Sequence, residues 1–482
     1  MKSLTLLPFS LLGLSLFGAA IQANATGLVS GDYQLRSDLV WLNNRNILNI
    51  NLSTWPLSQE EIERAITAAY SNGDPTVQRV INRVQNRLAF TKGPLRVSAR
   101  TQSSKSAIPQ GFSTTKTSGT GLGAAVEFST ETWDINIQGQ QEYDQYIDDT
   151  ARGNLNGSFA GVKVFNQWIA FGEIPQWWGP GYDGSLIRSD AARPVTGLLM
   201  QRAEQSPFES PWLSWMGNWQ YQLSAGQLRQ YQRPEDPKLI GGRLTVNPAT
   251  PLEVGFSRIM MWGGKGRPNN MSSFWDAFAG HDNTGNQARD PGDQMAGADF
   301  NWKLYTLTGI PVSIYGQVIG EDQAGILPSH NTFLAGLQGN HEWGNRQVNW
   351  YLEGADTRSG MKETGIIYYH YCYREGYYQQ GAPLGDAMGG DGTRYSGKTE
   401  IVLENEQRLS TKLMWARVNR TSQSINKTYP SSDTLKGVEL GWSLPASNKA
   451  TIEMGAWYVG YDSQQHNDTG ISVSVALSAG GG

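Results

Sequence analysis

The sequence predicts a mainly β protein: a closed antiparallel transmembrane β-barrel with a small α-helical bundle before it. Three observations lead to this fold class. A secretory signal opens the chain, and no later stretch is apolar enough for a spanning helix, at a mean hydropathy of −0.44. Glycine makes up 56 of 482 residues, about 12% against a usual ~7%, while charged residues are only 17%. From about Leu95, apolar and polar residues alternate with a period of two.

The first 25 residues are predicted to be a signal peptide. Lys2 supplies the positive start, and residues 6–17 form a short apolar core. Residues 23–25 (ANA) match the A-x-A pattern of a cleavage site. We therefore expect the mature chain to begin near Thr26 in an exported compartment, where it is either soluble or a membrane barrel.

Residues 26–94 are predicted to form the helical bundle. Ser58 and Glu61 make a capping box that starts one helix. Asp74-Pro75 starts a second helix, which Gly93-Pro94 ends. Their apolar stripes consist of Ile62, Ala65, Ile66 and Ala69, and of Val77, Val80, Ile81, Val84 and Leu88. A shorter helix is expected to begin at Ser37 or Asp38. Helices this short must pack together and against the rest of the chain.

Residues 95–482 are predicted to form the barrel. Clear strands with one apolar and one polar face lie around residues 133–138, 252–257, 347–353, 438–444, 451–456 and 471–477. A soluble sandwich also alternates, but here the polar face is Gln, Asn, Ser, Gly and Glu, which suits a barrel lumen. In lipid every strand edge must be paired, so the sheet must close. Roughly 380 residues at around 20 per strand and turn allow about 16 to 20 strands.

Residues 175–202 (PQWWGPGYDGSLIRSDAARPVTGLLMQR) are the most unusual segment. Two tryptophans and three arginines exceed what a turn needs. Aromatic faces beside carboxylates and guanidiniums suit a polyhydroxylated, often acidic ligand. The alternative is an internal loop that its arginines hold rigid through carboxylates. The candidate ligand-binding residues, here and in later loops, are Trp177, Trp178, Tyr182, Asp183, Arg188, Asp190, Arg193, Trp275, Asp276, Asp386 and Asp391.

Several function classes are disfavoured. A net charge of −4 gives no support for nucleic-acid binding. The five histidines are scattered without metal-ligand spacing, and one cysteine, Cys372, allows no intrachain disulfide. We predict no cofactor and no metal. The Asp/Asn/Gly-rich stretches 280–293 and 384–392 do not match a calcium loop and are interpreted as solvated loops.

Several motifs together resemble the Wzi family of capsule assembly proteins. Besides residues 175–202 they are LSTWPLSQEEI (52–62), NQW (166–168), SRIMMWGGKGRP (257–268), FWD (274–276), DNTG (282–285), GYYQQGAPLGDAMGGDG (376–392) and DTLKG (433–437). The resemblance implies an outer-membrane barrel of 18 strands with the helices at its periplasmic mouth. It also implies a lectin-like protein, not an enzyme, that attaches capsular polysaccharide to the cell surface.

The resemblance leads to further expectations. The expected partners are the capsular polysaccharide, outer-membrane lipid and lipopolysaccharide, with the capsule export machinery as a further candidate. The protein is expected to be a monomer with long extracellular loops.

The C-terminus departs from the usual pattern of such barrels. The chain ends in three glycines, whereas outer-membrane barrels usually end on an aromatic residue.

Two other functions stay open at this point. A porin or glycan channel would share the barrel and the polar lumen. A glycan hydrolase or lyase could use a carboxylate pair, such as Asp183 with Asp190 or Asp386 with Asp391.

Overall fold

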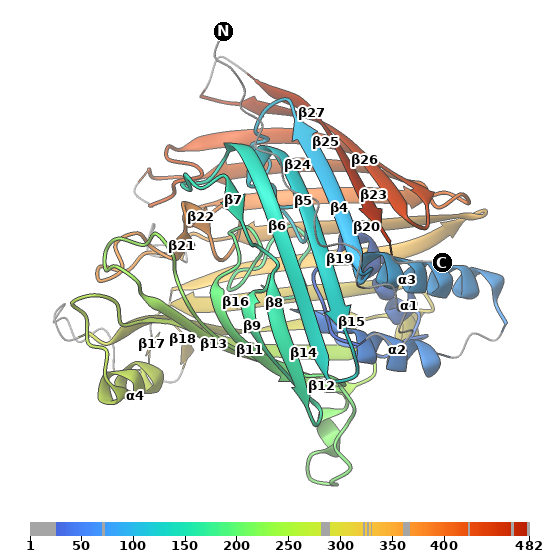
Figure 1. The fold of residues 1–482 in the computed structure, drawn as a ribbon, viewed down its shortest axis with the longest axis horizontal. Coiled ribbons are helices and arrows are strands. Elements are labelled where there is room, and N and C mark those ends of the chain that lie inside the picture. The colour runs from blue at the N-terminus through green and yellow to red at the C-terminus, as the bar shows by residue number, and fades with distance from the viewer. Residues whose placement is uncertain are drawn as a thin grey trace, which may run out of the picture.

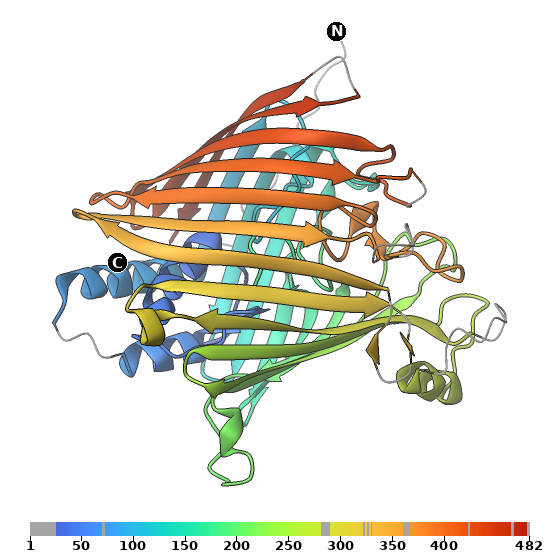
Figure 2. The same ribbon diagram turned by 180° about the vertical axis from the view of Figure 1, so that it is seen from behind.

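The computed structural model describes residues 26–69, 73–280, 290–321, 323–324, 327–328, 330–359, 367–422, 425–463 and 467–479. Its main feature is a closed antiparallel barrel (Figures 1 and 2). The predicted signal peptide, residues 1–25, lies outside the described residues. Among the helices that are described, none is long and apolar enough to cross a membrane.

The barrel has 18 strands. Two short segments, β7 (Gly153–Asn154) and β8 (Phe159–Val164), both pair with β6 and make one interrupted strand. The ring closes where β27 pairs with β4, with Ser472 opposite Gln102. The other strands are β4 (Leu95–Gln102), β5 (Ser118–Ser129), β6 (Trp133–Gln145), β9 (Gln167–Glu173), β11 (Thr196–Arg202), β12 (Trp219–Gln227), β13 (Lys238–Ala249), β14 (Leu252–Trp262), β15 (Gly292–Lys303), β16 (Val312–Glu321), β19 (Asn331–Trp343), β20 (Arg346–Asp356), β23 (Thr393–Val402), β24 (Arg408–Val418), β25 (Asp433–Ser447), β26 (Ala450–Tyr461) and β27 (Asp468–Ser478).

The two faces of the barrel wall are inverted relative to a soluble sheet protein. On β20 the polar Gln347, Asn349 and Glu353 are buried toward the lumen, while Leu352 between them is exposed. Ile137 of β6 and other large apolar residues around the barrel are exposed in the same way. An apolar outer wall of this kind requires lipid around it. The predicted fold class and the strand number that the resemblance implied are confirmed.

Three helices stand at the end of the barrel where β4 begins (Figure 1). They are α1 (Tyr33–Asn44), α2 (Gln59–Thr67) and α3 (Pro75–Thr91). The predicted N-caps of the second and third helices are confirmed: Ser58 accepts from the Glu61 N–H, and Asp74 accepts from the Thr76 N–H.

The predicted start of the first helix at Ser37 or Asp38 was wrong. The helix begins at Tyr33, because Asp32 is its N-cap and accepts a 2.8 Å hydrogen bond from the Leu35 N–H. Asp38 instead lies inside the helix. Its carboxylate is ion-paired to Arg83 of α3 at 2.8 Å and to Arg408 of β24 at 2.5 Å. The helical bundle is thus bound directly to the barrel wall.

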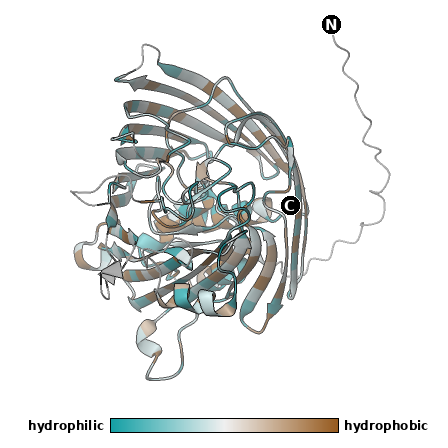
Figure 3. Ribbon diagram, turned by 90° about the vertical axis from the view of Figure 1, so that its left-hand side faces the viewer, coloured by the Kyte–Doolittle hydropathy of each residue, from teal (hydrophilic) through white to brown (hydrophobic). Residues whose placement is uncertain are grey.

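Chain segments also fill the lumen (Figure 3). The two-residue strand β10 (Trp177–Trp178) pairs with β2 (Thr54–Trp55) next to the helices, and β1 (Leu28–Val29) pairs with β3 (Leu57–Ser58). Farther along, β21 (Tyr378–Gln379) pairs with β22 (Ala382–Pro383). Outside the lumen, β17 (Gln323–Ala324) pairs with β18 (Leu327–Pro328), and the short helices are η1 (Ser214–Met216), α4 (Met271–Ala279) and α5 (Tyr305–Thr308).

Candidate functional site

The unusual segment folds back into the barrel between β9 and β11. Trp177 and Trp178 are both buried. The Trp177 ring meets Phe112 edge-to-face at 5.3 Å, within the same apolar cluster as the helices. The backbone N–H of Trp178 donates to the Arg188 carbonyl at 2.9 Å, which folds the segment into a hairpin. These tryptophans therefore form core, with no aromatic face turned toward solvent.

Asp183 and Asp386 lie in a buried charge cluster that reaches across to the barrel wall. Asp183 is ion-paired to Lys412 of β24 at 2.6 Å. Arg394 of β23 joins two carboxylates, Glu353 at 2.9 Å and Asp386 at 3.0 Å. Burial of ions is costly unless each charge is paired and hydrogen-bonded, and here opposite charges pair throughout. This cluster fixes two lumen loops to three strands of the wall.

The remaining lumen candidates are similarly engaged. Tyr182 stacks on Tyr351 with ring centroids 4.7 Å apart. Arg193 pairs with Glu142 and Asp149. The side chains of Asp190 and Asp391 accept hydrogen bonds from backbone N–H groups, those of Ser113 and Thr421 respectively.

The interpretation of residues 384–392 as a solvated loop was wrong. Asp386 and Asp391 are completely buried. The reason is tertiary: Arg394 pairs with Asp386, while both the N–H and the hydroxyl of Thr421 donate to Asp391. Residues 281–289 of the other Asp/Asn/Gly-rich stretch lie outside the described residues. Within the described parts of the chain, no group of His, Cys, Asp and Glu is arranged to hold a metal ion.

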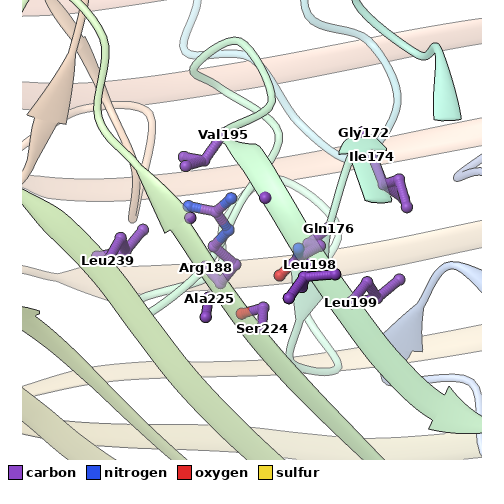
Figure 4. A pocket seen from close by; sticks show the side chains of 12 residues that line it. Gly172, Ile174, Gln176, Arg188, Val195, Leu198, Leu199, Ser224, Ala225 and Leu239 are labelled. Carbon is purple, nitrogen blue, oxygen red and sulfur yellow. The ribbon is translucent and has the colours of Figure 1, made fainter. Parts of the chain in front are cut away.

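Arg188 borders a cavity that is too small for a sugar. The cavity lies inside the wall of β9, β11, β12 and β13 (Figure 4). Its volume is about 10 Å³, which is about the room that one water molecule needs. Leu198, Leu239 and other apolar side chains also line it. We call the chain segments that fill the lumen the lumen plug. The cavity is a packing defect between this plug and the barrel wall.

Trp275 and Asp276 lie apart from the other candidates. Both are exposed residues of α4, in the loop between β14 and β15. Figure 1 shows α4 at the end of the barrel opposite to α1, α2 and α3. The structure thus brings nine of the eleven predicted residues into the lumen plug and leaves these two outside it.

A larger cleft opens among the loops at the end opposite to the helices. Its volume is about 450 Å³. Four loops build it: those that follow β6, β12, β20 and β24. Because antiparallel strands alternate in direction, these four loops all leave the same end of the barrel. The lining residues are Asp148, Thr150, Gln230, Gln232, Arg233, Arg374, Glu375 and Lys427.

The cleft is polar and carries exposed guanidiniums. Arg233 and Arg374 are exposed, and within the described residues neither side chain takes part in an ion pair. The backbone N–H of Arg374 donates to the Arg233 carbonyl at 3.0 Å, so the two loops are joined at this point. Lys427 is bound to Asp148 at 2.9 Å. Two arginines side by side on a joined backbone can bind carboxylates through paired N–H donors.

Sequence reasoning did not single out any residue of this cleft. Its eight lining residues come from loops that are up to 279 positions apart (Asp148 to Lys427). Each loop by itself resembles an ordinary polar connection. Counting strands along the sequence could have shown that these four loops lie at the same end of the barrel. It could not have shown that these particular loops meet.

These features define a class: a plugged, lipid-facing outer-membrane β-barrel with a polar cleft among its outer loops. The family described as capsule assembly protein Wzi matches residues 89–468, and the chain belongs to that family.

Two relatives are similar over nearly the whole chain. An uncharacterised 55.8 kDa protein in the cps region of Klebsiella pneumoniae is 51% identical over 464 residues, which cover 96% of this chain and 91% of that protein. A solved structure is 48% identical, with a TM-score of 0.89 over 94% of this chain and 100% of the other. That protein is Wzi, described as an outer-membrane protein involved in group 1 capsule assembly in Escherichia coli and as a carbohydrate-binding β-barrel.

Proposed function

We propose that this outer-membrane protein binds capsular polysaccharide in the cleft among its outer loops and so helps to attach the capsule to the cell surface. Family membership supports the role in capsule assembly, and the solved relative is described as a carbohydrate-binding barrel. The observation that carries the location of the site is the cleft itself. It has the volume of a small-ligand site and is lined largely by hydrogen-bonding and charged side chains.

The charge of the cleft favours a polymer that carries carboxylates. Lys427 and Asp148 neutralise each other, and Glu375 accepts a 2.8 Å hydrogen bond from the Gln232 N–H. Arg233 and Arg374 are then the groups left to meet an anionic sugar. Each contact at an exposed site is weak, so retention would come from many barrels binding one repeating chain.

The test uses purified capsular polysaccharide and the intact barrel in detergent. The double variant Arg233→Ala/Arg374→Ala should bind the polymer at least about tenfold more weakly, a loss of about 1.4 kcal/mol. Its unfolding should be unchanged because both side chains are exposed. The control Lys436→Ala removes an exposed cation that pairs with Asp462 and does not line the cleft, and this variant should bind normally. Equal binding by the double variant and the parent would exclude this site.

For the nine predicted residues in the lumen we propose a supporting role. Trp177, Trp178, Tyr182, Asp183, Arg188, Asp190, Arg193, Asp386 and Asp391 would hold the plug that carries the cleft, without contacting polymer. Their burial supports this role. Only Asp190 is partly exposed, and its carboxylate already accepts from the Ser113 N–H.

The channel and the enzyme are less well supported. Ion conduction needs an open lumen, whereas buried tyrosines and ion pairs occupy this one. Catalysis by Asp183 or Asp386 needs a carboxylate that substrate can reach, and both are sealed in ion pairs. We therefore propose a non-catalytic, non-conducting barrel. That it is a monomer and contacts the export machinery is a separate proposal, which comes from the family resemblance.

Single-channel recording in planar bilayers tests the proposed plug. We expect no steady conductance from the parent protein. A large and stable conductance would favour the channel.

A further inference from the structure

Helix α4 lies against the outer surface of the barrel wall. Phe256 and Met260 are four residues apart on β14 and point to the same, outer face of the sheet. Phe256 is 52% exposed, whereas Met260 is only 4% exposed. A Cβ atom built at Gly292 of β15 would lie 3.2 Å from the Ala277 Cβ of α4 and 3.7 Å from Met260. Helix α4 therefore covers the wall of β14 and β15 near their extracellular ends.

Aromatic and polar contacts set the orientation of α4. A capping box between Asn270 and Ser273 starts the helix. The Phe274 ring meets Trp262, the last residue of β14, edge-to-face at 5.6 Å. The Arg258 guanidinium of β14 lies 5.1 Å from the centre of the Phe278 ring. With both ends held, the remaining faces of the helix have defined directions.

The surface of α4 divides into three arcs at about 100° per residue. Ser273 and Ala277 are buried against the wall. Met271, Trp275 and Phe278 form an exposed apolar arc on nearly the opposite side, and Trp275 is 56% exposed. Between these two arcs lie Ser272 and Asp276, which are also exposed.

We propose that α4 is an interfacial helix whose apolar arc inserts into the outer-leaflet lipid surface beside the barrel. The apolar arc continues the outer wall, where Phe256 and Phe300 are already exposed to lipid. Tryptophan and phenylalanine on a short helix are typical of the boundary between headgroups and acyl chains. Lys238 borders the helix and suits anionic headgroups, and its Nζ lies 4.6 Å from the Trp262 ring centre.

The assignment separates Trp275 from the polysaccharide site. In the sequence Trp275 and Asp276 were candidates for sugar binding together. In the structure they point to different arcs of one helix: Trp275 would face lipid and Asp276 would face water.

Site-specific quenching in vesicles tests the proposal. Trp275→Cys and Asp276→Cys each receive a fluorescent label, and the parent chain, treated in parallel, corrects for any label on the buried Cys372. The proteins are inserted into phosphatidylcholine vesicles that contain doxyl-labelled lipid. We expect the label at position 275 to be quenched several-fold more by doxyl lipid than the label at position 276. Iodide in solution should give the reverse order.

Two outcomes would overturn the proposal. One is equal quenching of both labels by iodide with none by doxyl lipid, which would put the helix in water. The other is a large loss of polysaccharide binding in the double variant Trp275→Ala/Phe278→Ala, which would make the arc a sugar platform. The cleft variants do not touch α4, so failure of the polysaccharide site and failure of the lipid contact are separate results.

Discussion

The lumen plug and the outer cleft use the same kinds of residue in opposite ways. Where the plug meets the wall, Arg394 of β23 is fully buried and bound to Glu353 of β20 and to Asp386 of the plug. In the cleft, Arg233 and Arg374 are exposed, and no ion pair within the described residues engages them. A buried ion pair is a poor ligand site because opening it leaves charges unpaired in a medium of low polarity. Exposed arginines can meet a ligand at little cost.

This contrast explains why residues 175–202, which are the most unusual segment of the sequence, do not supply the proposed binding site. A glycan site and a sealed plug both require arginine, aspartate and aromatic residues. What separates them is whether the charges satisfy one another. In the segment between β9 and β11, Asp183 and Arg193 pair with residues of the wall and Asp190 accepts from a backbone N–H, whereas Arg233 and Arg374 of the outer loops face solvent.

The largest effect is expected from breaking the buried cluster. Arg394→Ala leaves Glu353 and Asp386 without their cation and should lower the free energy of unfolding by about 3–5 kcal/mol. Unfolding in urea, followed by loss of the compact band on unheated gels, measures it. The control Lys436→Ala, in an exposed pair with Asp462, should cost at most about 1 kcal/mol. Similar losses in both variants would refute the contrast between buried and exposed pairs.

The tryptophan pair gives the second test. Trp177→Ala removes a buried ring from the cluster that joins plug and helices, and should cost about 3 kcal/mol or more. Polysaccharide binding per folded barrel should stay unchanged. If binding disappears from barrels that remain stable, Trp177 contacts sugar and the plug is itself a site.

The third prediction is that salt concentration affects the outer cleft and the lumen plug differently. Screening acts strongly on exposed charges and weakly on buried ones, since the Debye length falls from about 30 Å at 0.01 M to about 3 Å at 1 M. Raising the salt concentration over this range should weaken polymer binding about tenfold, while the urea midpoint of the barrel changes little. Binding that is indifferent to salt would mean that the two arginines do not meet an anionic polymer.

The smallest expected effect is a loss of stability of the helical bundle at acidic pH. Burial alone would raise the pKa of the Asp38 carboxyl, but Arg408 and Arg83 hold that pKa below its ordinary value. Stability from this pair is therefore complete above about pH 4, where the unfolded group is ionised, and is lost as the pH falls through the lower folded-state pKa. Hydrogen exchange of α1 should accelerate in that acid range.

The matched variant is Asp38→Asn. In this variant the amide hydrogens of α1 should exchange faster at neutral pH, and the further acceleration in acid should be smaller than in the parent. Asp32, which Arg87 binds, should account for the remainder, since its folded-state pKa is also lowered. If the exchange of α1 in Asp38→Asn accelerates in acid as much as in the parent, the acid sensitivity does not come from Asp38.

Much of the fold was predictable from local pattern. The alternation around Leu352 and Ile137 predicted strands with a lipid face, and Ser58 and Asp74 predicted two helix starts. The start of α1 was missed because several polar residues could cap it, and only Asp32 is placed to accept from the Leu35 N–H. The burial of Asp386 was missed because local pattern does not show that residues 384–392 turn into the lumen, where Arg394, eight positions later on β23, pairs with Asp386.

Local sequence pattern was enough to predict export, a closed barrel and a helical segment before it. These depend on periodicity and on local capping, which act over a few residues. Which charges are buried in ion pairs and which face solvent follows from the packing of the whole barrel and not from local pattern. That choice depends on partners far apart in the chain: Asp183 of the plug meets Lys412 of the wall, while Arg233 and Arg374 meet only at the backbone. Burial makes an unpaired charge costly, and only the packed barrel defines what is buried.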